Sequence, residues 1–285
     1  MSLQPILDHL EIKINRYEPL HGGDINDAYC LYGDHEKYFL KVNSANRYPG
    51  MFEKESRGLT ALANHLPALV IPRAIQNGAV GQHQYLLLQW IEKGTPGKDF
   101  WESFGRSLAL MHLQGQAYFG WEEDNYIGSL QQNNSRHSEW HNFFSECRIL
   151  PLAKILFDTG VFSKRDLTEA ESFCKHSNRW FPTEPPALLH GDLWSGNYMV
   201  SSTGYAGVYD PAVYFGHREM DIGMTKLFGG FDQRFYGAYQ EIYSMEQNWI
   251  QRLSITQLYP LLVHAVLFGG HYVSSTKEII KQFSG

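Results

Sequence analysis

Apolar positions in the first third of the chain recur at every second residue or in short unbroken runs, as is typical of strands. The predicted strands cover 12–20, 28–32, 38–42, 70–72 and 85–91, after a short helix at 3–10. Between the third and fourth strands, Phe52, Leu59 and Leu62 are spaced three or seven residues apart, which predicts a helix with Glu55 on its apolar face. The pattern therefore predicts a small sheet accompanied by one long helix.

From residue 100 onward the apolar spacing changes to three and four positions. This predicts helices over 100–115, 140–156, 166–180 and most of 228–283. Within the last region, 258–268 is too short to span a bilayer and contains a proline and a histidine, so we interpret it as a buried helix. The change of pattern falls at a stretch rich in charge, glycine and proline that follows residue 91. The sequence therefore predicts a bilobal α+β protein, with a small antiparallel-sheet lobe at 1–91 and a larger, mostly helical lobe at 92–285.

One polar loop, 190–197, stands between two short apolar runs in the second lobe. It holds Asp192 and Asn197 five residues apart, and Asp210 follows at the end of another apolar strand. Phosphoryl transfer needs a carboxylate that accepts the proton of an attacking hydroxyl and oxygen ligands for a metal, as in the kinase loop D-x-x-x-x-N and its later Asp. We interpret Asp192 as a candidate base, and Asn197 and Asp210 as candidate Mg²⁺ ligands. A purely structural turn is the alternative.

The first lobe offers candidate nucleotide contacts. Gly22 and Gly23 lie between two predicted strands, where backbone N–H groups can approach phosphates, although such pairs also form simple hairpin turns. Lys41 interrupts an apolar strand and is either a phosphate-binding lysine or an exposed residue of an edge strand. Glu55 is its expected partner, because an unpaired carboxylate among core residues is costly. Three residues at the end of the last strand would contact adenine through their backbone: Gln89, Trp90 and Ile91.

Composition narrows the classes of protein further. The chain has 285 residues, 43% of them hydrophobic and 19% charged, with a net charge of −6. The absence of a basic stripe argues against nucleic acid or an anionic membrane as the main partner. The N-terminal residues lack a signal-peptide layout. Three widely spaced cysteines without metal-ligand spacing are interpreted as small buried hydrophobic residues of a reduced, cytoplasmic protein.

Five segments of the chain resemble the fructosamine kinase (ketosamine 3-kinase) family, which has a protein-kinase-like, aminoglycoside-phosphotransferase-like fold. They are His190-Gly191-Asp192-Leu193-Trp194-Ser195-Gly196-Asn197, Asp210-Pro211-Ala212, His217-Arg218-Glu219, Asp124-Asn125-Tyr126-Ile127-Gly128 and Leu258-Tyr259-Pro260-Leu261-Leu262. The resemblance implies that ATP, with Mg²⁺, phosphorylates a ketosamine at the third sugar carbon, after which the product breaks down and returns the amine. By position, it implies Asp192 as base, Asn197 and Asp210 as magnesium ligands, and Lys41 with Glu55 as the phosphate anchor.

Residues near the polar loop and before residue 128 are candidate contacts for a small-molecule ketosamine or glycated amine. Trp194 follows the candidate base by two residues, so its indole should emerge near the attacking hydroxyl and could contact a cationic amine. Packing against the second lobe is the alternative for this residue. A polar, aromatic loop before residue 128 predicts a binding surface and adds Asn125 and Tyr126. We expect a monomer or a homodimer.

Two alternatives stay open. One is a kinase for another hydroxyl acceptor, such as an aminoglycoside, choline or a pentose derivative, since fold alone does not choose among these. The other is a catalytically silent nucleotide-binding protein, against which the complete set Lys41, Asp192, Asn197 and Asp210 argues. Two departures from the family pattern are Asp24, an extra carboxylate in the glycine loop, and Val263, where a polar residue is expected.

Overall fold

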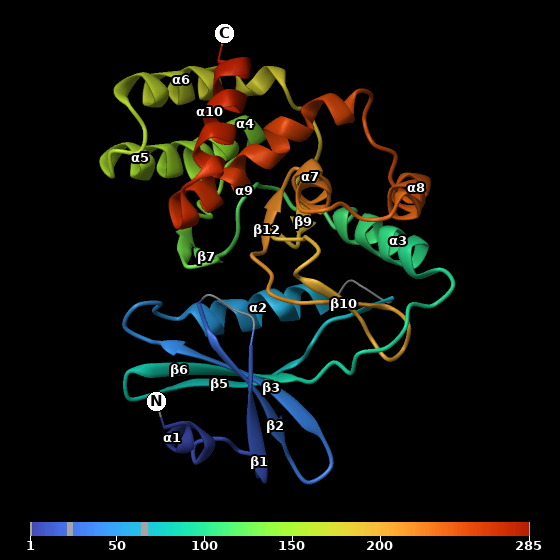
Figure 1. The fold of residues 1–285 in the computed structure, drawn as a ribbon. Coiled ribbons are helices and arrows are strands. Elements are labelled where there is room, and N and C mark those ends of the chain that lie inside the picture. The colour runs from blue at the N-terminus through green and yellow to red at the C-terminus, as the bar shows by residue number, and fades with distance from the viewer. Residues whose placement is uncertain (1, 22–24, 64–67, 285) are drawn as a thin grey trace.

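The structure, a computed structural model, describes residues 2–21, 25–63 and 68–284 and consists of two lobes (Figure 1). The N-terminal lobe contains a five-stranded antiparallel sheet with the strand order β1-β2-β3-β6-β5. The elements of this lobe are α1 (Gln4–Leu7), β1 (Arg16–Leu20), β2 (Asp27–Tyr32), β3 (Lys37–Ser44), α2 (Met51–Ala63), β5 (Ala74–Val80) and β6 (His83–Gln89). The predicted glycine pair, Gly22 and Gly23, lies outside the described residues, as does Asp24.

Alternation along the strands gives this sheet two buried faces. On β6, Leu87 packs in a core with residues of α1, whereas Leu86 and Leu88 pack in a second core with α2. Phe52 and Leu59 supply the apolar face of α2, as their spacing predicts. The helix therefore holds a fixed position between the sheet and the other lobe.

One strand prediction is wrong. Residues 70–72 do not join the five-stranded sheet: β4 (Leu69–Val70) instead pairs in parallel with β11 (Ala206–Val208) of the C-terminal lobe. Its neighbours explain this, because Leu69 and Ile71 pack against the C-terminal core. The fifth strand of the sheet is β5, whose polar residues and glycine gave no clear alternation. The first strand also begins at Arg16, later than predicted.

The C-terminal lobe is mostly helical, with short strands around the polar loop. Its elements are α3 (Phe100–His112), β7 (Asn125–Ile127), β8 (Leu130–Gln132), α4 (Trp140–Phe143), the π-helix η1 (Phe144–Ile149), α5 (Leu150–Asp158), α6 (Lys164–Lys175), the 3₁₀ turn η2 (Ser177–Arg179), β9 (Ala187–Leu189), β10 (Tyr198–Val200), β11, β12 (Tyr214–Gly216), α7 (Glu219–Leu227), α8 (Gln233–Ile242), the 3₁₀ turn η3 (Trp249–Arg252), α9 (Leu253–Phe268) and α10 (His271–Phe283). The expected buried helix at 258–268 is confirmed as the C-terminal part of α9, where Leu258 and Leu262 are fully buried. Among the described residues, no helix combines the length and apolar character that a bilayer crossing requires.

The connection between the lobes lies against the β10–β11 hairpin. The Gly94 N–H donates to the Val200 carbonyl (3.0 Å), and the Ser202 N–H donates to the Glu92 carbonyl (2.7 Å). A Cβ atom on Gly94 would lie 2.4 Å from the Ser201 carbonyl oxygen, so only glycine permits this approach. The division of the chain at residue 91 stays a prediction. What the structure adds is that this hairpin contacts both β4 and the connecting segment.

Candidate active site

The polar loop between β9 and β10 is held by a buried carboxylate behind it. Asp221 accepts hydrogen bonds from the backbone N–H groups of His190 (2.8 Å) and Gly191 (2.9 Å). His112 contacts the same carboxylate through Nε2 (3.2 Å) and Tyr239 through Nδ1 (2.8 Å), so both nitrogens of its ring are engaged in this buried contact. Gly191 has a φ of +82°, and a Cβ there would lie 2.0 Å from the Ala212 carbonyl oxygen. The loop can therefore adopt this shape only with glycine at 191.

Asp192 and Asn197 face each other across the loop. The Asn197 amide nitrogen donates to the Asp192 carbonyl (2.8 Å) and to its carboxylate Oδ2 (2.9 Å). Both bonds use the amide nitrogen, which leaves Oδ1 of Asn197 available to a metal ion. His190 fixes the start of the loop: its Nε2 donates to the Tyr209 carbonyl (3.1 Å) and its Nδ1 accepts from the Asp192 N–H (3.3 Å).

Burial raises the pKa of Asp192 to about 7. The hydrogen bond from Asn197 lowers this pKa, while the negative charges of Asp210 and Asp221 raise it further. A general base works best when its pKa lies near the operating pH. The environment of Asp192 thus suits proton transfer rather than a permanent ion pair.

Lys41 joins the two lobes electrostatically. Its Nζ lies 2.7 Å from Glu55 Oε1 and 2.5 Å from Asp210 Oδ1. Burial alone lowers the pKa of Lys41, but the charges of Asp210 and Glu55 outweigh burial and leave this pKa above its usual value. The predicted contact between Lys41 and Glu55 is confirmed. The second contact, with Asp210, was not predicted.

Asp210 has a left-handed backbone conformation, with φ of +57°. Such a conformation is rare for a residue with a side chain and persists only where the surroundings enforce it. The residues on both sides are held: the Tyr209 N–H donates to the Asn197 carbonyl (3.1 Å) and the Ala212 N–H to the His190 carbonyl (2.9 Å). The strained position therefore aims the carboxylate toward Lys41 and the polar loop.

A buried amide network holds the segment after Asp210. Asn125 donates to the Val213 carbonyl (2.8 Å), and its own Oδ1 accepts from Gln132 (2.7 Å) and Asn134 (2.9 Å). Arg148, which is completely buried, donates to Asn134 Oδ1 (2.7 Å). Sequence patterns did not indicate Arg148, because nothing marks an arginine on an apolar helix as buried.

One cavity of about 770 Å³ joins these groups. It is lined by all of the predicted site residues that the structure describes: Lys41, Glu55, Gln89, Trp90, Ile91, Asn125, Tyr126, Asp192, Trp194, Asn197 and Asp210. Residues of both lobes therefore meet in one place, although up to 169 positions separate directly contacting partners.

Residues that were not predicted complete the walls of the cavity. Phe39, Met199 and Tyr209 add apolar or aromatic surface near the connecting segment. At the other end, His264 lies on α9 and donates from Nδ1 to the Pro260 carbonyl (2.7 Å). Burial lowers the pKa of His264, so its ring is neutral and Nε2 is an acceptor. The apolar runs that contain these residues predicted core positions only, so their sequence gave no signal of a cavity.

The three residues predicted to contact the acceptor differ in which of their groups remain free to face the cavity. The Trp194 ring packs edge-on against Phe228, with a centroid distance of 5.4 Å. A Cβ on Gly196 would lie 2.4 Å from the indole, so this glycine allows the ring to fold over the loop. Tyr126 donates to the Pro49 carbonyl (3.1 Å) and keeps its ring at the cavity. The Asn125 amide already bonds through both its nitrogen and its oxygen to groups of the C-terminal lobe, so Asn125 shapes the wall.

The oxygen atoms of Asn197 and Asp210 are the candidate ligands for a magnesium ion. Asn197 Oδ1 and the Asp210 carboxylate are hard oxygen donors, and Mg²⁺ usually takes one or two carboxylates together with phosphate oxygens and water. In the part of the chain that the structure describes, no group of three or more His, Cys, Asp or Glu side chains could hold a metal. The residues thus fit a magnesium ion that is shared with a bound phosphate.

Comparisons with known proteins agree with this arrangement. The family model described as fructosamine kinase matches residues 6–284. A protein of Synechocystis named "Probable ketoamine kinase" is 39% identical over 272 residues, covering 95% of this chain and 90% of the relative. A solved structure from Thermobifida fusca, named for fructosamine-3-kinase, superposes with a TM-score of 0.84 at 31% identity and covers 95% of this chain and 93% of its own.

Solved structures with much lower sequence identity share the same fold. A spectinomycin phosphotransferase solved with ADP and spectinomycin gives a TM-score of 0.62 at 14% identity, covering 98% of this chain and 93% of its own. At this identity the likeness concerns the fold alone. The predicted kinase-like, aminoglycoside-phosphotransferase-like architecture is confirmed.

Proposed function

The chain belongs to the fructosamine kinase family, and we propose that it uses ATP to phosphorylate ketosamines at the sugar 3-hydroxyl. The observation that carries the proposal is the meeting of Lys41, Asp192, Asn197 and Asp210 around one cavity. This set contains a base, two oxygen ligands and a cation for phosphate. It also argues against a catalytically silent protein of the same fold, since no member is missing.

Asp192 is proposed to accept the proton of the 3-hydroxyl. As that proton leaves, the sugar oxygen forms a bond to the γ-phosphorus of ATP and the bond from this phosphorus to the bridging oxygen breaks, which releases ADP. Asn197 orients the carboxylate through its bond to Oδ2 (2.9 Å). His190 and Asp221 hold the loop on which both residues lie.

Asn197 and Asp210 are proposed to hold Mg²⁺, which when bound neutralises charge on the phosphates. Lys41 would contact the phosphates of ATP while Glu55 keeps its ammonium in place. The backbone of Gln89, Trp90 and Ile91 would face adenine. Three further residues, Gly22, Gly23 and Asp24, are proposed to cover the phosphates or to affect their binding, although they lie outside the described residues.

On the acceptor side, Trp194 and Tyr126 are proposed to contact the sugar and its cationic amine. Asn125 would support this wall. Phosphorylation at C3 gives a product that breaks down and returns the amine, so the proposed role is deglycation of a small-molecule or glycated amine. We propose a cytoplasmic enzyme, monomeric or homodimeric; free Cys30, Cys147 and Cys174 support the reduced setting.

An acceptor panel tests the proposal. Fructosyl-, ribulosyl- and erythrulosyl-amines are offered beside choline, an aminoglycoside and a free pentose, each with ATP and Mg²⁺, and ³¹P–¹H NMR locates the new phosphate. We expect phosphate on C3 of a ketosamine, formed at least about 100-fold more slowly by Asp192→Asn under the same conditions. Preference for any of the other three acceptors would overturn the ketosamine assignment and leave a kinase. No ATP-dependent product with any acceptor would favour the silent protein.

A further inference from the structure

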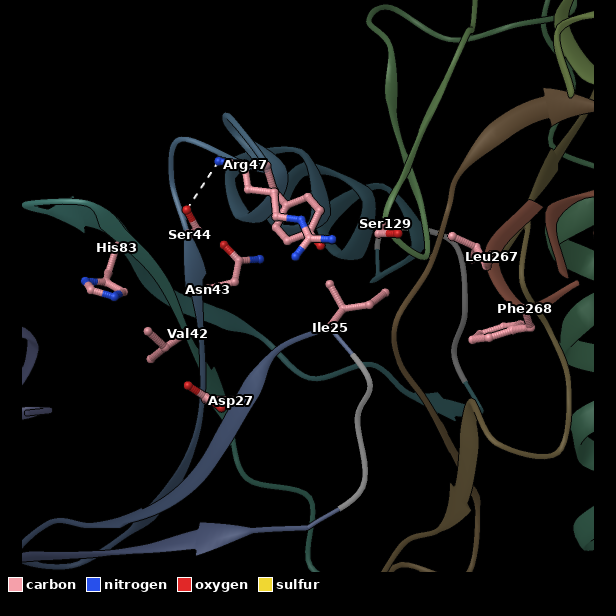
Figure 2. A pocket seen from close by; sticks show the side chains of 11 residues that line it. Ile25, Asp27, Val42, Asn43, Ser44, Arg47, His83, Ser129, Leu267 and Phe268 are labelled. Carbon is pink, nitrogen blue, oxygen red and sulfur yellow. Dashed lines mark hydrogen bonds between the residues drawn. The ribbon is translucent and has the colours of Figure 1, made fainter. Parts of the chain in front are cut away.

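A second cavity, of about 370 Å³, opens between the lobes beside the main one (Figure 2). The two cavities share three lining residues, Ile25, Leu267 and Phe268. The second cavity lies toward the ends of β3 and β6 that are remote from the lobe connection, since Ser44 and His83 line it and pair with each other. A substituent that leaves the acceptor site at this end passes the three shared apolar side chains first.

The second cavity carries one charge of each sign. Arg47 and Asp27 line it, and neither forms an ion pair with another described residue at the 4.0 Å limit. Both side chains come from the N-terminal lobe, and Figure 2 shows them on the strands and turn around the opening. An arginine and an aspartate without ion-pair partners at one opening match the carboxylate and ammonium of an amino acid.

The position of Arg47 is coupled to the wall of the main cavity. Its backbone N–H donates to Ser44 Oγ (3.3 Å), and its guanidinium lies 5.2 Å from the centre of the Tyr48 ring. Tyr48 is buried and packs edge-on against Tyr126, at a centroid distance of 6.5 Å. Tyr126 lines the proposed acceptor site. Arg47 is thus oriented by the same aromatic pair that bounds the sugar.

The floor of this cavity is fixed by hydrogen bonds. Asn43 donates to Asn26 Oδ1 (2.8 Å) and accepts from Gln84 Nε2 (2.7 Å). Asn26 in turn lines the main cavity. These amides are engaged with each other, whereas Arg47 and Asp27 are the groups of opposite charge that line the opening.

We propose that the second cavity binds the amino-acid end of the acceptor, with Arg47 on the carboxylate and Asp27 on the ammonium. This inference rests on the proposed function, because it concerns the amine half of the same ketosamine. The three apolar side chains that line both cavities, those of Ile25, Leu267 and Phe268, suit an aliphatic chain. The preferred acceptor therefore carries methylenes between the glycated nitrogen and a zwitterionic α-carbon. An ε-glycated lysine as a free amino acid has this pattern.

The test compares ketosamines that share one sugar and differ only at the far end of the amine. The amines are ε-linked lysine as the free amino acid, the same lysine within a capped peptide, and two linear amines of equal length that end in a carboxylate or a carboxamide. We expect Arg47→Gln to raise KM about 3- to 10-fold for the two acceptors with a carboxylate and less than about 2-fold for the others, with kcat unchanged. Arg47→Glu should raise KM for the carboxylates further.

Arg136→Gln is the matched control. Arg136 is also exposed and also lies over a tyrosine ring, that of Tyr118 at 4.2 Å, but it lines neither cavity. Its substitution should leave all four KM values within about 2-fold of wild type. Equal KM values for carboxylate and carboxamide acceptors in wild type, or equal changes for both in Arg47→Gln, would overturn the inference while leaving the kinase intact. A wild-type enzyme that phosphorylates no ketosamine would overturn the proposed function, and the inference with it.

Discussion

The contacts of Lys41 lead to a quantitative prediction for Lys41→Met and Glu55→Gln. The Lys41 and Glu55 side chains are 7% and 11% exposed, whereas that of Asp210 is 46% exposed. Removing one partner of a buried ion pair costs about 3–5 kcal/mol of unfolding free energy, because it leaves an uncompensated charge. Water can solvate Asp210, so we expect Lys41→Met to fall near the lower end of that range.

Glu55→Gln should cost less. Lys41 keeps its contact with Asp210, and the glutamine oxygen can still accept a hydrogen bond, so a loss of about 1–2 kcal/mol is expected. The double variant has no buried ammonium and no buried carboxylate at 55. Its loss should therefore be no larger than that of Lys41→Met alone, which gives a coupling energy of at least about 1–2 kcal/mol between the two sites.

Urea unfolding of wild type, both single variants and the double variant measures this coupling, and ATP KM measured in parallel should rise in the three variants. Glu53→Gln is the control, because Glu53 lies on the same helix in an exposed pair with Arg57 and should cost less than about 1 kcal/mol. Strictly additive losses would show that Lys41 and Glu55 do not interact. A loss for Glu53→Gln as large as that for Glu55→Gln would show that position on the helix, not the ion pair, sets the effect.

Three other substitutions test the site. Asp192→Asn should keep the fold and lower kcat by about 10²- to 10⁴-fold or more, and near-normal turnover would remove Asp192 from the base role. Since burial raises the pKa of Asp192 to about 7, wild-type kcat/KM for the acceptor should fall as pH drops below that value, because the carboxyl is then protonated. The folded state holds this proton more tightly than the unfolded state, so the protonated Asp192 carboxyl contributes stability that is lost as pH rises from about 4 to 7. Over that interval the Tm of Asp192→Asn should therefore rise relative to that of wild type. Asp210→Asn should raise the Mg²⁺ concentration that gives half-maximal activity, and an unchanged midpoint in a magnesium titration would mean that Asp210 is structural. Trp194→Ala should raise KM for the ketosamine with little change for ATP, whereas lower thermal stability with equal losses for all acceptors would indicate packing alone.

Local spacing was enough to predict several parts of the site. The five-residue separation of Asp192 and Asn197 fixed them on one loop, and the helical spacing around Glu55 placed it on the buried face of α2. The strand containing Lys41 was also predicted, and its contact with Glu55 followed from the cost of an unpaired buried carboxylate. These inferences needed only short-range periodicity and electrostatics.

The rest depends on contacts between distant parts of the chain. The bond from Lys41 to Asp210 spans 169 positions, and no local pattern indicates it. Pairing of β4 with β11 depends on the C-terminal core, so the short run at 70–72 was assigned to the wrong sheet. Arg148 is stabilised by backbone carbonyls, an amide and aromatic rings that come together only in the folded lobe. Its sequence neighbours carry none of that information.

The attachment of the β10–β11 hairpin to both β4 and the connecting segment determines how the lobes can move. Backbone hydrogen bonds attach this one hairpin to both segments, so we expect any relative rotation of the lobes to turn about an axis close to it. Asn197 precedes the hairpin and Asp210 follows it, so such a rotation should displace these two residues little. Arg47 and Phe268 come from different lobes and line the second cavity, so the same rotation should change their separation more. We therefore expect the entrance for bulky amines to vary in width while the spacing of the proposed metal ligands stays nearly constant.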